Sequence, residues 1–278
     1  MQIQLDRPGA AVARRRDGTA GTRASDMRAM MWLNADRVLY VGLLGAPSVR
    51  TLGAYSIYLS LRLPHRISVD AGPWQSTELS IVPAHVPHRI VSAEPMICSV
   101  LIEAETVAQA QLPSALRDGH GAVDAPGLCH DMRRALEALR RGQQRRYAST
   151  EDFDISIFGE ALAARQLDAR IVKVLHRIKS DPNQPHPATD CAALIHISVS
   201  RFLHLFKAEV GVPFRSFRTW QRARSVLHFV TQTANLATIA LDVGYPDSTH
   251  FSHSIRQVFG LTPKSIFEGC RKLELYGA

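Results

Sequence analysis

Hydrophobic and polar residues alternate in short runs between residues 36 and 104, and from there they recur mainly at helical spacing. The short runs are rich in Val, Ile, Leu and Tyr and are separated by Pro and Gly, which is typical of strands joined by tight turns. They cover residues 38–44, 55–63, 66–70, 78–82, 88–92 and 97–103. Such regularly spaced strands predict an all-β sandwich or a small barrel.

Alternation within residues 55–63 places Tyr55 on one face of a strand and Tyr58 and Arg62 on the other. The pattern does not decide which face lies inside. Aromatic and charged side chains in such a domain are suited to line a small-molecule pocket. The candidate ligand-binding residues are Tyr55, Tyr58, Arg62, Trp74 and His88.

Two amphipathic helices are expected after the strands, over residues 128–141 and from Ser149 to about residue 162. They could cover the β domain, connect it to the next domain, or form a dimerisation surface. The sequence leaves these three roles open.

The last third of the chain predicts two helix-turn-helix units, at residues 192–211 and 236–263. In each unit a short apolar helix is followed by a tight turn and by a second helix with a polar outer face. That second helix has the size and polarity to lie in a DNA major groove. Two units in one chain could read two stretches of groove about one helical turn apart.

In the first unit, Phe202, Leu205 and Phe206 fall on one face of the second helix and predict its buried side, with Ser198 as its N-cap. The outward residues can contact bases or phosphates, and Leu203 can touch a thymine methyl group. The candidate DNA-binding residues here are Ser200, Arg201, Leu203, His204 and Lys207.

In the second unit, Phe251 and Ile255 face inward and Asp247 caps the second helix. We therefore assign Asp247 a structural role and expect Arg256 to meet a phosphate. The candidate DNA-binding residues here are Ser248, Thr249, His250, His253 and Arg256.

Charge supports a nucleic-acid partner for the C-terminal part. The chain carries a net charge of +8, and residues 165–278 hold 15 Lys and Arg against 8 Asp and Glu, a net charge of +7. Double-stranded DNA is the expected partner. The four cysteines are far apart and form no C-x-x-C pair, which argues against a zinc cluster or a disulfide scaffold.

Residues 167 to about 270 resemble the AraC/XylS family of bacterial transcription regulators. The resemblance rests on three segments: A-A-L-I-H-I-S-V-S-R-F-L-H-L-F-K-A-E-V-G, P-F-R-S-F-R-T-W-Q-R-A-R-S-V-L, and I-A-L-D-V-G-Y-P-D-S-T-H-F-S-H-S-I-R-Q-V-F-G-L-T-P-K-S-I-F. His253, Ile255 and Arg256 depart from it, because the family usually has Arg, an aromatic residue and Lys at these positions.

The resemblance implies a DNA-binding regulator, often an activator, that works with RNA polymerase. Its N-terminal domain would be a cupin-like β barrel that binds a small-molecule effector or forms a homodimer. The segment S-I-V-P-A-H-V-P-H-R-I looks like a cupin segment in which a His opens the next strand, and His88 takes that position.

A metal-dependent cupin enzyme fused to a helical domain is the alternative. His65, His85 and His88 could in principle bind a metal. However, the chain lacks the H-x-H…E cluster of metal-binding cupins, so we expect no metal, no cofactor and no enzyme activity.

The predicted fold is an α+β multidomain chain with four parts. They are a disordered extension (1–30), a cupin-like effector-binding or dimerisation domain (31–125), a helical connector or dimerisation region (126–166), and an all-α DNA-binding domain (167–278). No apolar run reaches the roughly 18 residues of a membrane span. We therefore expect no membrane partner and a cytoplasmic location.

Overall fold

The computed structural model describes residues 29–44, 47–142, 147–230, 235–269 and 273–276. Most of the extension predicted to be disordered, residues 1–28, lies outside the described residues. Within the described ranges no single helix is long and apolar enough to cross a membrane, and only a pair of helices bent by 86° passes that test by length and composition.

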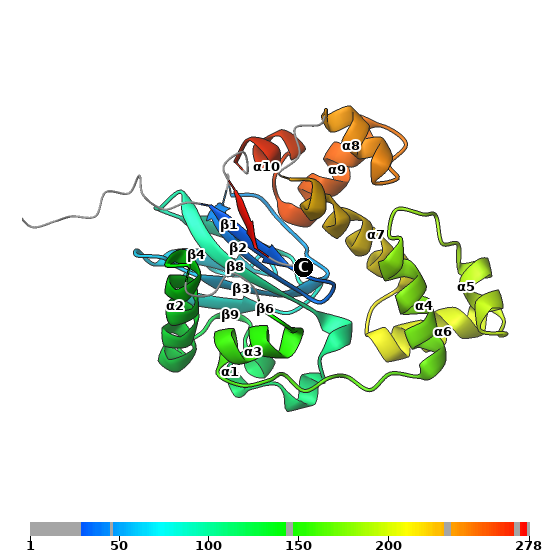
Figure 1. The fold of residues 1–278 in the computed structure, drawn as a ribbon, viewed down its shortest axis with the longest axis horizontal. Coiled ribbons are helices and arrows are strands. Elements are labelled where there is room, and N and C mark those ends of the chain that lie inside the picture. Colours follow the sequence, from blue (N-terminus) through cyan, green and yellow to red (C-terminus); the bar gives the residue numbers. More distant parts are fainter. Residues whose placement is uncertain (1–28, 45–46, 143–146, 231–234, 270–272, 277–278) are drawn as a thin grey trace, which may run out of the picture.

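The described strands form two sheets (Figure 1). The large sheet has seven strands in the order β10-β1-β2-β8-β3-β6-β9. Its strands are β10 (Glu274–Tyr276), β1 (Met30–Leu33), β2 (Arg37–Leu43), β8 (Met96–Glu103), β3 (Ala54–Leu59), β6 (Leu79–Val82) and β9 (Gly121–Ala122). The small sheet has the order β5-β4-β7, with β5 (Gln75–Thr77), β4 (His65–Val69) and β7 (His88–Ser92).

All six strands expected from the hydrophobic pattern are present, as β2, β3, β4, β6, β7 and β8. The expected barrel is not closed. The large sheet ends at β10 and β9, and β4 pairs with β5 and β7 but with no strand of the large sheet. The N-terminal part is therefore a sheet-rich domain of two open sheets.

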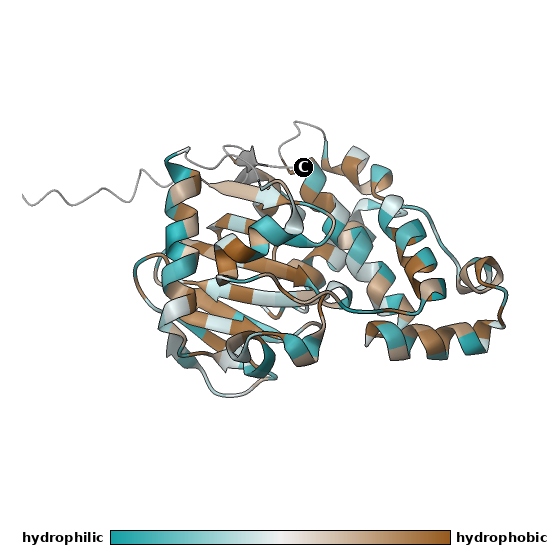
Figure 2. Cartoon of the chain, turned by 60° about the horizontal axis from the view of Figure 1, so that its bottom comes forward, coloured by the Kyte–Doolittle hydropathy of each residue, from teal (hydrophilic) through white to brown (hydrophobic). Residues whose placement is uncertain are grey.

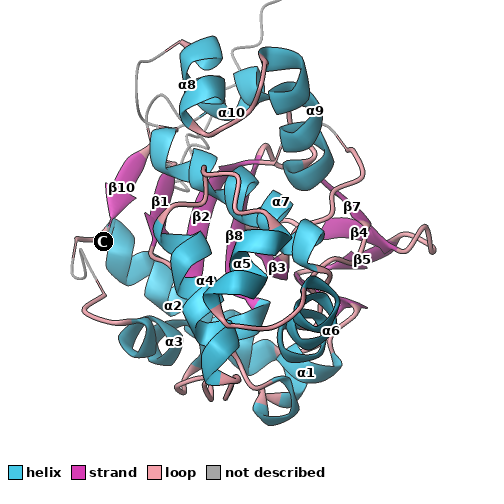
Figure 3. Cartoon of the chain, turned by 90° about the vertical axis from the view of Figure 1, so that its right-hand side faces the viewer, coloured by secondary structure: helices cyan, strands magenta, loops and turns pink. Residues whose placement is uncertain are grey.

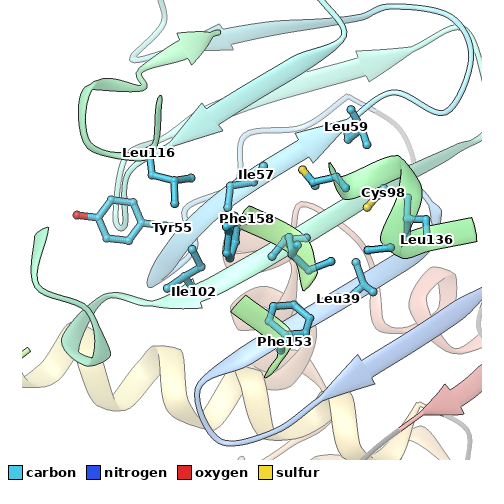
Figure 4. Close-up of a cluster of buried hydrophobic side chains, with 14 of the residues drawn as sticks. Leu39, Tyr55, Ile57, Leu59, Cys98, Ile102, Leu116, Leu136, Phe153 and Phe158 are labelled. Carbon is cyan, nitrogen blue, oxygen red and sulfur yellow. The ribbon is translucent and has the colours of Figure 1, made fainter. Parts of the chain in front are cut away.

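Three helices cover one face of the large sheet: α1 (Ser114–Asp118), α2 (Pro126–Arg140) and α3 (Thr150–Phe158). The apolar side of α2 and Phe153 of α3 belong to the same buried cluster as Tyr55, Ile57 and Leu59 of β3 (Figure 4). Figure 2 shows hydrophobic residues concentrated on the strands and hydrophilic residues on the outer side of α2. The two amphipathic helices thus cover the sheet, and their use in dimerisation stays a prediction.

The opposite face of the large sheet is covered by two different structures. The small sheet packs over one end, where Tyr58 meets Ile67 and Ile90 in a small apolar cluster. Helices of the C-terminal domain pack over the other end, where Ala54 belongs to the same cluster as Trp220. Both faces of β3 are therefore inside, which the alternation in the sequence could not decide.

The C-terminal domain consists of two helical arms joined by α7 (Figure 1). The first arm contains α4 (Ala169–Ser180), α5 (Ala188–Leu194) and α6 (Val199–Val210). The linking helix α7 (Phe214–Ser225) continues into a short 3₁₀ turn, Val226–Phe229. The second arm contains α8 (Leu236–Asp242), α9 (Ser248–Phe259) and α10 (Pro263–Gly269).

After α10 the chain returns to the large sheet. Strand β10 pairs in parallel with β1, and Met31 lies opposite Leu275. Residues 274–276 were expected to continue the helical domain, and β1 was not expected as a strand. Both strands are short. Hydrophobic and polar residues do not alternate in β1, because this strand is buried along its whole length.

Helix α7 lies across the end of the large sheet, and a buried polar cluster fixes it there (Figure 3). Glu103 at the end of β8 accepts hydrogen bonds from Trp220 Nε1 at 2.8 Å and Gln221 Nε2 at 2.9 Å. Arg224 Nε lies 2.7 Å from the second oxygen of Glu103. Burial raises the pKa of Glu103 to about 7, while the positive charge of Arg224 acts to lower it.

A second ion pair extends this cluster to the first helix of the C-terminal domain. Lys179 Nζ lies 2.7 Å from Glu105 and 3.1 Å from Asp36. Close packing accompanies the charges, because a Cβ atom at Gly53 would lie only 2.2 Å from the ring of Trp220. A side chain at position 53 would therefore push α7 off the sheet.

We predict that Glu103→Ala lowers the free energy of unfolding by about 3 kcal/mol, because the buried donors of Trp220, Gln221 and Arg224 lose the acceptor that they share. Urea unfolding measures the change. Glu137→Ala is the matched control, since Glu137 forms only exposed ion pairs with Arg140 and Arg141. Equal stability of the two variants would contradict a stabilising role for the cluster.

Candidate nucleic-acid interface

The first helix-turn-helix unit consists of α5 and α6. Ser198 caps α6 as expected, since its side chain accepts a hydrogen bond from the Arg201 backbone N–H at 3.3 Å. Phe202 and Phe206 are fully buried in a core shared with α4 and α7. Gly211 ends the helix in the left-handed conformation, at φ 87°.

Burying this side leaves the opposite side of α6 in solvent. The structure exposes Leu203 by 40 % and Val199 by 37 %. All five candidate residues of this helix are exposed, namely Ser200, Arg201, Leu203, His204 and Lys207. Their contacts with DNA stay a prediction.

The second unit consists of α8 and α9, and Asp247 has the structural role expected for it. Its carboxylate accepts hydrogen bonds from the backbone N–H groups of Thr249 and His250, each at 2.8 Å. The same carboxylate lies 2.7 Å from Nδ1 of His250. These contacts, led by the backbone bond from His250, hold the pKa of Asp247 below its usual range.

The outer side of α9 is also exposed. Phe251 and Ile255 are buried as expected, and all five candidate residues of this helix lie in solvent. These five are Ser248, Thr249, His250, His253 and Arg256. The bond to Asp247 occupies Nδ1 of His250 and leaves Nε2 available to a partner.

The two units are linked through α7 and through one close backbone contact. Phe214 and Phe217 of α7 belong to the core of the first unit, whereas Trp220 belongs to that of the second. Gly244, in the turn of the second unit, has φ 75° and approaches the loop of the first arm so closely that a Cβ atom would lie 2.3 Å from the Asn183 carbonyl oxygen. The relative position of α6 and α9 is therefore constrained at two places.

The candidate ligand-binding residues of the sheet domain do not form one site. Tyr58 and His88 come together, with 2.8 Å between the phenol oxygen and Nε2. Tyr55 faces the helices on the other side of the sheet, and Arg62 is exposed. Trp74 lies on the small sheet with the guanidinium groups of Arg66 and Arg89 each 5.5 Å from its ring.

Sequence reasoning missed a cavity of about 140 Å³ between the large sheet and the second arm. Tyr58 reaches it from the sheet, Phe259 and Ile266 line it from the helices, and Arg50 is its charged residue. Arg50 lies in a loop outside every strand, so its position gave no periodic signal.

The three histidines considered as metal ligands are separate. The ring nitrogens of His65 bond to Ser60 at 2.7 Å and Ser80 at 2.8 Å, and those of His88 bond to Tyr58 and the Val86 carbonyl. In the part of the chain that the structure describes, no three His, Cys, Asp or Glu side chains gather as metal ligands would. The imidazoles of His65 and His88 are used in hydrogen bonds within the sheet domain.

Burial lowers the pKa of His65 to about 4, from an ordinary 6.5. The folded protein thus protonates His65 less readily than the unfolded chain does. The contribution of His65 to stability therefore falls as the pH drops from 6.5 to 4. We predict that over this pH range the free energy of unfolding of the wild type falls by about 3 kcal/mol more than that of His65→Gln. Unfolding of both proteins at several pH values measures this difference. Glu103 changes stability in the opposite direction, but both proteins contain it, so its contribution cancels in the comparison. Parallel pH profiles would contradict a neutral His65.

The Asp247 cap gives a further prediction. Asp247→Ala should destabilise the second unit, because two backbone N–H groups lose their acceptor. Asp247→Ser keeps a capping oxygen and is the control, expected to stay close to wild type. Hydrogen exchange of the α9 amides measures both. Loss of protection in α6 as well as α9 would show that the cap has no local role.

Comparison with known proteins places these units in context. A family model described as a helix-turn-helix domain matches residues 191–269. The arabinose operon regulatory protein of Escherichia coli is 31 % identical over 77 residues, which are 27 % of this chain and 26 % of that protein. The invasion protein InvF of Salmonella typhi is 30 % identical over 71 residues, or 25 % of this chain and 33 % of that protein. The matches therefore span only about a quarter to a third of these relatives.

The fold as a whole is similar to that of ToxT from Vibrio cholerae. An apo ToxT structure has a TM-score of 0.56 and 12 % identity, covering 85 % of this chain and 98 % of that one. A second ToxT structure, solved with an unsaturated fatty acid bound, has a TM-score of 0.55 and 13 % identity, covering 85 % and 96 %. At this identity the likeness shows the two-domain fold alone.

Proposed function

Residues 191–269 belong to the AraC-type helix-turn-helix family, and we propose on this basis that the whole chain is a sequence-specific DNA-binding transcription regulator. One observation carries the proposal. Both α6 and α9 are capped at their N-termini, buried on one side and exposed along a polar side, as a helix that enters the major groove has to be. Their joint attachment to α7 suits the reading of two neighbouring elements on one DNA molecule.

The proposal gives the N-terminal domain the role of sensing a small molecule. Its support is the shared fold with ToxT, one structure of which holds an unsaturated fatty acid. Activation through RNA polymerase, homodimer formation and a cytoplasmic site of action belong to the same proposal, as does a cupin-like origin of the two open sheets. No observation favours the metal-dependent enzyme, since His65 and His88 are engaged in separate hydrogen bonds and no metal-ligand cluster occurs among the described residues.

Selection of fragmented genomic DNA on the purified full-length protein tests this function. We expect discrete sites that contain two short elements about one helical turn apart. His204→Ala in α6 should relax specificity in one element and His253→Ala in α9 in the other, each by about 1–3 kcal/mol for a lost base contact. Competition binding with mutated sites measures these changes.

His176→Ala is the matched control, because His176 is an exposed histidine on α4 and belongs to neither reading helix. It should recover the wild-type sites. Diffuse recovery that depends only on salt concentration would contradict sequence-specific reading. A uniform loss over all sequences in either variant would assign that histidine to a phosphate instead of a base.

A further inference from the structure

The cavity lies between the two domains, and residues of both domains line it. Val38 and Leu101 line it from the large sheet, and Phe259 of α9 and Ile266 of α10 line it from the second helix-turn-helix unit. Most of its surface is apolar. Arg50 is the charged residue among those that line it, and this residue is 5 % exposed.

Arg50 is a buried cation without a counter-charge. No carboxylate in the described part of the chain forms an ion pair with it, its Nε atom has no hydrogen-bond partner, and its Nη2 atom reaches the Leu44 carbonyl oxygen only at 3.5 Å. A guanidinium carries five N–H donors and keeps its charge at all ordinary pH values. Such a group is unfavourable away from water unless an anion neutralises it.

The protein neutralises this charge only in part. Arg50 lies beside Gly260 at the C-terminal end of α9, where a Cβ atom would be 3.0 Å from Nε. A helix end carries only about half an elementary charge. Tyr58 also lies near Arg50, but burial raises the pKa of its phenol, which therefore stays neutral.

The size of the cavity limits the apolar part of a ligand. A cavity of about 150 Å³ with apolar walls holds benzene. The present cavity, at about 140 Å³, accordingly suits one aromatic ring or an aliphatic chain of about six to eight carbon atoms.

We propose that this cavity binds a small carboxylic acid with an apolar body, either an aryl acid or a medium-chain fatty acid, whose carboxylate pairs with Arg50. A carboxylate accepts two parallel N–H bonds from a guanidinium and supplies the missing full charge. The body fills the space between the sheet and the helices.

A ligand in this cavity contacts the second helix-turn-helix unit directly. The loop that carries Arg50 is bonded to the end of α9, through Thr51 N–H to the Gln257 carbonyl at 3.2 Å and through the Ser48 hydroxyl to the Gly260 carbonyl. Its role as an effector rests on the proposed function. Binding itself does not depend on that function.

Calorimetric titration of the full-length protein tests the proposal. Octanoate and 3-phenylpropionate are the probes, octan-1-ol and 3-phenylpropanamide their neutral counterparts, and hexadecanoate an acid too long for the cavity. We expect at least one short acid to bind with one-to-one stoichiometry, about tenfold or more tightly than its neutral counterpart and more tightly than hexadecanoate. The short acid that binds more tightly shows whether the cavity prefers an aryl group or an alkyl chain. Absence of binding by both short acids, or equal binding of acid and neutral compound, would overturn the proposal.

Two variants localise the site. Arg50→Gln should weaken binding of the acid about tenfold or more and leave the neutral compound unchanged. Ser99→Leu fills the cavity from β8, so it should abolish binding of both while Arg50 stays in place. Arg134→Gln on the exposed side of α2 is the control and should bind as wild type.

Wild-type affinity in a folded Ser99→Leu variant would overturn this location of the site, even where Arg50→Gln fails to fold.

DNA binding by the same preparations separates the ligand hypothesis from the regulator hypothesis. Protein that selects discrete DNA sites but binds no acid disproves only the ligand. Protein that binds the acid at Arg50 but selects no DNA sites disproves only the regulator.

Discussion

The docking of α7 against the large sheet is the contact on which the rest of the arrangement depends. Trp220, Gln221 and Arg224 meet Glu103 from one side of that helix, all in surroundings from which water is excluded. Hydrogen bonds to a buried charge are directional and costly to break. Because α7 also joins the two helix-turn-helix units, fixing it on the sheet fixes both units relative to the sheet domain.

The sequence could predict whatever depends on local periodicity. Alternation identified six strands, and the i, i+3, i+4 spacing of Phe202, Leu205 and Phe206 identified the buried side of α6. Contacts between distant residues have no such signal. Glu103 and Trp220 are 117 positions apart, and neither lies in a motif that indicates a partner. Arg50 likewise reads as a charged loop residue, and only the fold shows that α9 and the sheet enclose it.

The two reading units differ in what holds them. The core of the first is formed within the C-terminal domain, from α4, α5, α6 and α7. The core of the second is continuous with the sheet, since Ile239, Phe251 and Ile255 belong to the same apolar cluster as Met31 and Val38. A displacement in the sheet domain therefore reaches α9 through direct side-chain packing in this cluster, whereas α6 belongs to a separate core.

The pairing of β10 with β1 has a mechanical consequence. The chain leaves the sheet domain at residues 163–165, where backbone hydrogen bonds join Ala163 to Ala108 and Arg165 to Thr106, and it is fastened again where Glu274–Tyr276 joins the sheet. A body attached to a frame at one point can turn in any direction. A body attached at two points keeps a single axis of rotation, the line through them. Once α7 has left the sheet, any rigid-body movement of the helices relative to the sheets is thereby reduced to swinging about that line, unless the sheet also loses its edge strand.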